Sequence, residues 1–307
     1  MREVLIFFSD LSFEVRFAEE FMRDDIHVVV DSLSCVADTD LKNDPRVHEL
    51  RLMVRHGEIE WYDGDKTIAE MLQLIEASGK LPTTSQPPLG EIIALYTELV
   101  QAGKKVIVLN VDHVLSGTHE TCKMAARQVM QEVKGADIRV FDMLTASSPI
   151  AGMAMDVLDR IEAGDDMDAL EAYIKNALER TNSFFSVDTL EYLQKGGRIG
   201  KLSGLIGGIL GIRPIVNLGV HTDGQLVPAD KCRTRKKVLK RMVELAHEQG
   251  ELERIYVANC ECPEDAQSLA ETMQQDYPGV PVLSTGIGTV LAAHLGPGAI
   301  GLFVRKK

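Results

Sequence analysis

Hydroxyl side chains gather in a stretch that precedes a helical pattern. Residues 83–91 read Thr83-Thr84-Ser85-Gln86-Pro87-Pro88-Leu89-Gly90-Glu91, and apolar residues then repeat with the spacing of one helix face, at Ile92, Tyr96, Leu99 and Val100. Because proline is favoured at the first helical position, we expect the helix to begin at Pro87 or Pro88. The unpaired N–H groups and partial positive charge of a helix start attract small anions. The hydroxyls therefore act either as ordinary helix caps or as part of a carboxylate or phosphate site.

A second hydroxyl-and-glycine loop follows the clearest strand pattern of the chain. The apolar run Val106–Leu109 shows no alternation, which is typical of a parallel strand buried on both faces. The loop after it reads Asp112-His113-Val114-Leu115-Ser116-Gly117-Thr118, and a helix is predicted from there to about Val133. Two such loops at neighbouring helix starts can share one anion, and this coincidence favours the anion site over capping alone.

His294 is the third candidate for a ligand contact. A short helix is predicted over Gly286–Ala293, so that His294 comes at its end, just before the glycine loop Leu295–Ala299. A single histidine is more often structural than functional. Both interpretations stay open on local grounds.

Strands and helices alternate through the first 160 residues, which indicates an α/β fold with a parallel sheet and helices on both of its faces. The expected elements include strands at Val4–Phe8 and Ile26–Val30, a helix at Phe13–Met22, and a hairpin of Val47–Val54 with Glu58–Tyr62. The sequence pattern changes after a glycine and two aspartates at 164–166, so we predict a domain boundary between residues 1–163 and 164–307. In the second part, Asp188–Glu191 predicts a capping box at the start of a short helix.

Composition excludes several classes of protein. The 307 residues carry a net charge of −13, which argues against nucleic-acid binding because that needs a basic face. The five cysteines form no Cys-x-x-Cys pair, so we expect neither a disulfide framework nor a metal site, and we expect no cofactor. No signal peptide is recognised, and the apolar stretch Leu202–Ile212 is too short to span a bilayer. A cytoplasmic protein without stable membrane insertion is expected.

Seven glycines lie within residues 196–211. A Walker phosphate loop is excluded, because Gly200-Lys201 is followed by Leu202. Glycines at 200, 204 and 208 leave small positions along one side of a possible helix. This side either packs closely on a neighbouring element or leaves space for a long apolar ligand, lined by Leu205, Ile206, Ile209 and Leu210.

Basic residues crowd into the segment 231–241. They are Lys231, Arg233, Arg235, Lys236, Lys237, Lys240 and Arg241, and Thr234 looks like the N-cap of a helix that ends at Gly250. Basic residues in the first turn oppose the helix dipole by roughly 0.3–1 kcal/mol each. On so acidic a chain, the segment is either a docking patch for an acidic partner or a solvated face.

Six blocks, taken in order, resemble the DegV family of bacterial fatty-acid-binding proteins, whose members include the lipid-carrying subunit of fatty acid kinase. The blocks are Leu81–Pro87, Leu115–Thr118, Thr189–Ile199, Gly211–Ile215, Lys231–Lys237 and Gly296–Phe303. The resemblance covers roughly residues 27–307, and residues 1–26 form an extension before it. The sequence departs from the family pattern in three places. Cys35 stands where the second aspartate of an Asp-Ser-Thr-Ala-Asp block is usual, Pro88 replaces a serine, and Asp112-His113-Val114 replaces Ser-Ser-Gly.

The resemblance implies two α/β domains with an acyl chain in a tunnel at their junction. It implies that Thr84, Ser116 and His294 hold the fatty-acid carboxylate, with a supporting loop of Ser85, Gln86, Gly117 and Thr118. It also implies that the chain has no catalytic activity of its own. A fatty acid kinase catalytic subunit would phosphorylate the bound long-chain fatty acid to an acyl phosphate, docking at Arg233, Arg235, Lys236 and Lys237.

Two other classes of function stay open. Ser116 has His113 three residues before it, so a serine hydrolase is conceivable, but a nucleophilic serine needs a base in hydrogen-bond reach, and no Gly-x-Ser-x-Gly elbow is present. The second class is a sensor or scaffold that binds lipid without a kinase.

Overall fold

The first of the three sheets in the described part of the chain is parallel throughout. The computed structural model describes residues 23–205 and 211–307, so the expected strand Val4–Phe8 and helix Phe13–Met22 lie outside the described residues. The parallel sheet has the order β2-β1-β6-β7, formed by Val47–Leu50, Ile26–Asp31, Lys105–Asn110 and Ile138–Asp142. The sequence predicted this parallel arrangement, and the α/β fold class is confirmed.

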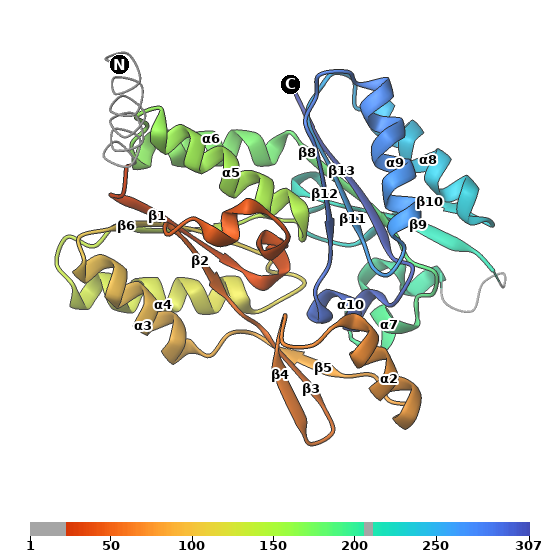
Figure 1. Cartoon of the computed structure of the whole chain (residues 1–307), viewed down its shortest axis with the longest axis horizontal. Coiled ribbons are helices and arrows are strands. Elements are labelled where there is room, and N and C mark those ends of the chain that lie inside the picture. Colours follow the sequence, from red (N-terminus) through yellow and green to blue (C-terminus); the bar gives the residue numbers. More distant parts are fainter. Residues whose placement is uncertain (1–22, 206–210) are drawn as a thin grey trace, which may run out of the picture.

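Helices cover both faces of the parallel sheet (Figure 1). Helices α3 (Leu89–Gln101) and α4 (Thr118–Glu132) pack against Val106 and Val108 on one face. Helix α5 (Ser148–Glu162) packs with Ile107 and Leu109 on the other, and α6 (Met167–Glu179) lies beside α5. Alternate residues of β6 therefore enter two separate cores, which explains why the strand reads as an unbroken apolar run.

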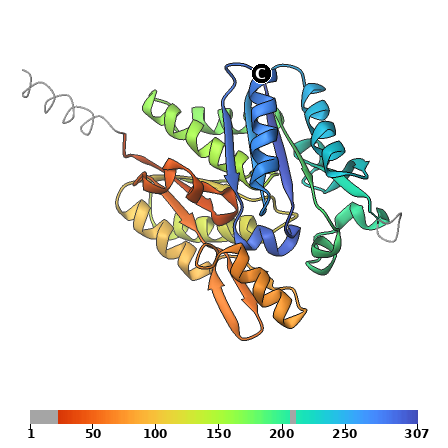
Figure 2. The same cartoon turned by 45° about the vertical axis from the view of Figure 1, so that its right-hand side comes forward.

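A small antiparallel sheet projects from the body of the molecule (Figures 1 and 2). Its order is β4-β3-β5, formed by Ile59–Tyr62, Met53–His56 and Thr83–Ser85, and helix α2 (Ile68–Ser78) follows the hairpin. The expectation of one strand over Val47–Val54 was wrong. The segment is divided, because β2 pairs with β1 while β3 pairs with β4 and β5.

The hydroxyl-rich stretch that precedes α3 is a strand rather than a helix cap. Thr83, Thr84 and Ser85 pair with β3, and α3 begins at Leu89 with Pro88 at its N-cap and no side-chain capping bond. The helix start was thus predicted to within a residue or two, but the hydroxyls do not cap it.

The third sheet is mixed and contains six strands. Its order is β10-β9-β8-β13-β11-β12, formed by Val227–Cys232, Arg213–Leu218, Thr181–Ser186, Ile300–Lys306, Leu252–Asn259 and Val282–Gly286. Only the β11–β12 pair is parallel. Helices α8 (Arg235–His247) and α9 (Pro263–Asp276) cover one face. The described part of the chain holds no helix long and apolar enough to cross a membrane.

Short helices join the sheets. Helix α7 (Glu191–Lys195) begins after Leu190 without a side-chain cap, so the capping box predicted at Asp188–Glu191 is not formed. Helix α10 (Thr289–Leu295) contains His294 in its last turn, and it ends two residues beyond the expected Ala293. Five 3-10 helices complete the described elements: η1 (Ser32–Ser34), η2 (Val36–Asp38), η3 (Asp40–Asn43), η4 (Gly200–Leu205) and η5 (Val220–Thr222).

Helix α5 joins the two large sheets. Gly152 packs so closely on β11 that a Cβ atom there would lie 2.1 Å from Cε1 of Tyr256. One turn further, the buried Asp156 accepts hydrogen bonds from Arg254, at 2.6 Å, and from Arg305. Both parts of the chain thus share a core across α5, while the boundary drawn at residue 163 stays a prediction.

Candidate functional site

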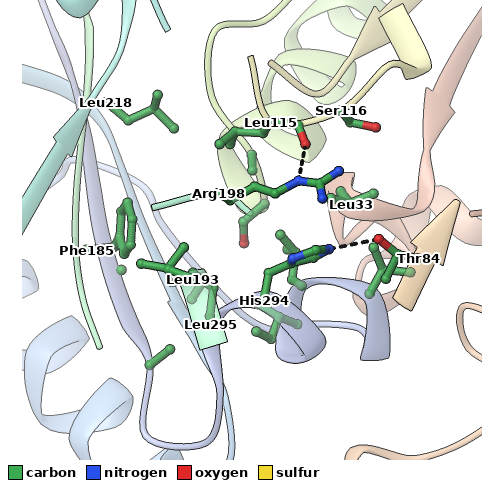
Figure 3. Close-up of a pocket in the computed structure, with 18 of the residues that line it drawn as sticks. Leu33, Thr84, Leu115, Ser116, Phe185, Leu193, Arg198, Leu218, His294 and Leu295 are labelled. Atoms are coloured by element: carbon green, nitrogen blue, oxygen red, sulfur yellow. Dashed lines mark hydrogen bonds between the residues drawn. The ribbon is translucent and has the colours of Figure 1, made fainter. Parts of the chain in front are cut away.

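Thr84 and His294 meet although they are 210 residues apart in the sequence. Thr84 is the central residue of β5, and its Oγ1 lies 2.8 Å from Nε2 of His294 in the last turn of α10 (Figure 3). Strand β5 reaches α10 because the small sheet packs against it, as the indole of Trp61 on β4 shows by donating to Thr289 Oγ1 at 3.2 Å. Two of the three predicted ligand contacts therefore form one hydrogen-bonded pair.

Ser116 lies in the loop that leads from β6 into α4. The N–H groups of Leu115 and Ser116 donate to the carbonyl oxygen of Asp112, both at 3.1 Å, and Gly117 is the N-cap of α4. The Ser116 hydroxyl lies 2.8 Å from Oγ1 of Thr118. This loop therefore sits at a helix start, as the sequence predicted.

Gln86 connects the two hydroxyl stretches. Its Nε2 donates to Oγ1 of Thr121 in the first turn of α4, at 2.5 Å. A Cβ atom on Gly117 would lie 2.2 Å from Oε1 of Gln86, so any other residue at 117 would displace the Gln86 side chain. The end of β5 and the start of α4 are thereby held side by side.

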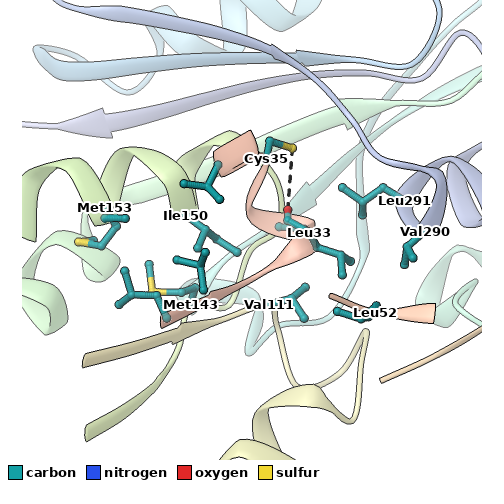
Figure 4. Packing of buried hydrophobic residues seen from close by; sticks show 14 of the residues in the cluster. Leu33, Cys35, Leu52, Val111, Met143, Ile150, Met153, Val290 and Leu291 are labelled. Carbon is teal, nitrogen blue, oxygen red and sulfur yellow. Dashed lines mark hydrogen bonds between the residues drawn. The ribbon is translucent and has the colours of Figure 1, made fainter. Parts of the chain in front are cut away.

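A cavity of about 270 Å³ begins at these polar groups and continues between the two large sheets. Thr84, Ser85, Gln86, Ser116, Gly117 and His294 all line it. The rest of the wall is largely apolar and includes Leu33, Leu52, Phe185, Leu193, Leu218, Leu226, Val290 and Leu291. Several of these residues also belong to the central core (Figure 4), so buried apolar side chains form much of the wall of the cavity. A polar end and an apolar body suit an amphipathic molecule.

His294 is neutral at physiological pH. Burial, with a further contribution from the positive charge of Arg198, lowers the pKa of its imidazole to about 4. Its Nε2 is engaged with Thr84, and its Nδ1 is buried with no hydrogen-bond partner in residues 23–205 and 211–307. Together with the hydroxyls, a neutral imidazole adds a hydrogen-bonding group without adding charge.

Arg198 is a member of the site that the sequence analysis did not single out. Its guanidinium lies in the wall of the cavity between the Ser116 loop and α7 (Figure 3). Nε donates to the carbonyl oxygen of Leu115 at 3.1 Å, and Nη1 donates to that of Gly196 at 2.7 Å. It places a positive charge beside the polar end, as an anion site requires. The sequence feature that could have pointed to Arg198 is a large charged side chain among the glycines of residues 196–200.

The four predicted tunnel residues do not account for the cavity. Leu205 packs against the central core from η4 but does not line the cavity, and Ile206, Ile209 and Leu210 lie outside the described residues. The apolar wall is instead formed by side chains from η1, β8, α7, β9 and α10, most of which the sequence analysis did not assign.

The predicted docking residues divide into two groups. Arg233, Lys236 and Lys237 are exposed. Arg235 is partly buried, and its guanidinium contacts Asp265 and the carbonyl oxygen of Gly298, both at 2.6 Å. Arg235 therefore ties the start of α8 to α9 and to the loop before β13.

The geometry does not form a serine–histidine dyad. The hydrogen-bond partners of the Ser116 hydroxyl in the described residues are the hydroxyl and N–H of Thr118, and His294 is bonded to Thr84. An activated serine needs a base that accepts its proton. In the described residues, the Ser116 hydroxyl therefore has no such base among its hydrogen-bond partners.

The fold and sequence agree with known proteins over nearly the whole chain. A family described as "Uncharacterised protein, DegV family" matches residues 25–307. Protein DegV of Bacillus subtilis is 29% identical over 290 residues, which cover 90% of this chain and 98% of that protein. A DegV family protein from Thermus thermophilus, described as fatty-acid binding, superposes with a TM-score of 0.82 and 27% identity over 92% of this chain and all of that chain. The structure of Bacillus subtilis DegV, described as a fatty acid binding protein, superposes with a TM-score of 0.78 and 28% identity. This match covers 92% of this chain and 99% of that chain. With the family matched across all but the first residues of the sequence, the chain belongs to the DegV family.

Proposed function

We propose that this protein binds a long-chain fatty acid, with its carboxylate at Thr84, Ser116 and His294 and its tail in the apolar part of the cavity. The observation that carries the proposal is a single cavity with hydroxyls, an imidazole and Arg198 at one end and aliphatic and aromatic side chains along the rest. The Thermus thermophilus and Bacillus subtilis relatives, both described as binding fatty acids, support the same ligand class.

The two parts of the ligand contribute differently to binding. Burial of a methylene is worth about 0.8 kcal/mol, so some fourteen methylenes of a sixteen-carbon tail would supply roughly 11 kcal/mol before ordering costs. Charge-assisted hydrogen bonds contribute about 1.5–3 kcal/mol each. The tail therefore dominates the affinity, while the polar groups fix the position of the carboxylate.

The proposal includes a kinase partner that converts the bound carboxylate to an acyl phosphate in the cytoplasm. In this scheme the protein has no catalytic role of its own and presents its ligand to a fatty acid kinase catalytic subunit. Exposed Arg233, Lys236 and Lys237 at the start of α8 supply a basic surface on an otherwise acidic chain, which favours an acidic partner. Arg198 beside the carboxylate end supplies a positive charge for the added phosphate.

Native mass spectrometry of the freshly purified protein tests the ligand. We expect a bound species with the mass of a long-chain fatty acid, released on denaturation. A lipid-free protein that also fails to bind added palmitate or oleate would contradict the proposal. A protein that binds lipid but shows no affinity for a fatty acid kinase at micromolar concentration would instead be a lipid sensor or scaffold.

A further inference from the structure

Three side chains of metal-ligating type meet at the carboxyl edge of the parallel sheet. Asp112 and His113 follow β6, and Asp142 ends β7, the neighbouring strand, where it pairs with Asn110. Nδ1 of His113 lies 2.5 Å from Oδ2 of Asp142 and 3.6 Å from Oδ1 of Asp112. One donor atom from each of the three lies within 4.8 Å of the others. The sequence analysis expected no metal site, because it considered only the cysteine spacing.

Asp112 carries a second observation that points to a ligand. Its side chain is fully buried, and Oδ1 accepts from the N–H of Val114 at 2.8 Å. Oδ2 is buried and has no hydrogen-bond partner in the described part of the chain. A buried carboxylate oxygen without a donor is unfavourable and uncommon in native proteins. The Asp112 oxygen nearest to His113 is Oδ1, so a cation shared with His113 and Asp142 would satisfy Oδ2 by binding both oxygens of the Asp112 carboxylate.

The carboxylate of Asp112 is held in place from the far side. The turn between β9 and β10 packs on it, and a Cβ atom on Gly224 would lie 2.6 Å from Oδ1 and 2.8 Å from Oδ2. Gly224 has φ = +68°, a conformation that suits glycine. The carboxylate is therefore confined between this turn and the two other side chains.

We propose that Asp112, His113 and Asp142 form a binding site for a divalent transition-metal ion, for which Zn²⁺ is the probe. One imidazole nitrogen and two carboxylate oxygens match the donor types of zinc, and three protein ligands leave a fourth position for water. Hard ions such as Mg²⁺ and Ca²⁺ prefer oxygen ligands alone, so the imidazole disfavours them. The three donor atoms lie within 4.8 Å of one another, and the 2.5 Å contact between His113 and Asp142 must lengthen to admit an ion.

The site lies at the base of the loop that carries Ser116. The carbonyl oxygen of Asp112 accepts from Leu115 and Ser116, and its carboxylate accepts from Val114. An ion on Asp112 and His113 would fasten this loop to β7. The inference does not depend on the ligand of the cavity, because the three side chains are not among the residues that line it.

The test is a Zn²⁺ titration of the chelator-treated full chain in competition with a fluorescent zinc indicator. We expect one equivalent to bind, and His113→Ala and Asp142→Asn to weaken it by about tenfold or more. His113 is 42% exposed and Asn keeps an acceptor for the two N–H groups that Asp142 binds, so both variants should fold. His247→Ala is the matched control, because His247 pairs with Asp276 at 3.0 Å but belongs to no three-residue cluster found in the described residues.

Cobalt distinguishes this site from the free cysteines of the chain. Co²⁺ bound by nitrogen and oxygen gives visible d–d bands without the near-ultraviolet charge-transfer band of thiolate ligation. That spectrum, lost in His113→Ala and kept in His247→Ala, would support the proposal. It would be overturned by the absence of stoichiometric binding, by a thiolate spectrum, or by equal affinity of wild type, His113→Ala and Asp142→Asn for Zn²⁺.

Discussion

Gly196 lies so close to His294 that a Cβ atom on it would stand 2.4 Å from the imidazole Nδ1. The same atom would be 2.9 Å from the carbonyl oxygen of Tyr192, which belongs to the backbone of α7 and cannot move aside easily. The absence of a side chain at the end of α7 therefore sets the position of the histidine that bonds to Thr84.

We expect Gly196→Ala to displace His294 and to cost about 1–3 kcal/mol in the free energy of unfolding, because overpacking forces neighbours to shift. Urea denaturation measures the stability, and an acyl phosphate assay with a kinase partner measures the site. Gly204→Ala is the matched control, since nothing lies within 4 Å of a Cβ atom there. Equal stability and activity of the two variants would mean that Gly196 does not position the histidine.

Removal of the Ser116 hydroxyl should affect the presentation of the carboxylate to the kinase while leaving the binding of the lipid intact. In Ser116→Ala the apolar wall of the cavity is intact, so we expect lipid to copurify while acyl phosphate formation falls. His294→Ala should behave in the same way, although Thr84 also loses its partner. Ser284→Ala, an exposed serine in β12, is the control. Lipid content by mass spectrometry decides the question, and a lipid-free Ser116→Ala protein would show that the carboxylate contacts dominate affinity.

The depressed pKa of His294 predicts a pH dependence of stability. In the folded protein this imidazole stays neutral down to about pH 4, whereas the ordinary pKa of a histidine side chain is 6.5. Between these values the unfolded chain binds more protons, so the contribution of His294 to stability falls as pH decreases from 6.5 towards 4. Burial raises the pKa values of Asp31 and Asp112 to about 7, so the contributions of these two residues to stability change with pH in the opposite direction.

The contribution of His294 is therefore measured as the difference in stability between wild type and a variant without the histidine. Free energies of unfolding of wild type and His294→Gln should be compared from pH 4 to pH 7, so that the two aspartates contribute equally to both proteins. We expect the difference in stability between wild type and variant to shrink as pH falls through this window. A difference that stays constant with pH would mean that the folded histidine titrates as it does in the unfolded chain.

The basic residues at the start of α8 should divide by function. The triple variant of Arg233, Lys236 and Lys237 to alanine should lower kinase affinity in a salt-dependent way with unchanged thermal stability, because these side chains are exposed. Arg235→Ala should destabilise the protein by about 1–3 kcal/mol, because Asp265 and the Gly298 carbonyl lose a charged donor. Calorimetry and a binding titration on the same samples separate the two effects. An unchanged Arg235→Ala melting temperature would contradict the structural role given to that residue.

Local patterns predicted much of the fold and part of the site. The unbroken apolar run of β6 and the loop around Ser116 could be recognised because their roles follow from adjacent residues. Thr83–Ser85 were expected to lie at a helix start, as caps or as part of an anion site, but their conformation is set by pairing with β3, some thirty residues earlier. The division of Val47–Val54 between two sheets has the same cause.

The apolar wall and Arg198 could not be predicted from local patterns for a related reason. Leu33, Phe185 and Leu218 each follow the pattern of an ordinary core residue, and only the packing of two sheets around one space distinguishes them. Arg198 is noticed only when its guanidinium is seen to reach the Leu115 carbonyl, 83 residues away in the chain. Contacts of this range depend on the assembled fold rather than on spacing.

The contact of α5 with β11 and β13 has a consequence for how the protein melts. Asp156 is buried with two arginines from the third sheet, and Gly152 is pressed against Tyr256. Separating the halves would break both of these buried ion pairs and expose the apolar side chains of the core that the halves share. The molecule should therefore lose its structure in one cooperative transition, with neither half persisting after the other has gone.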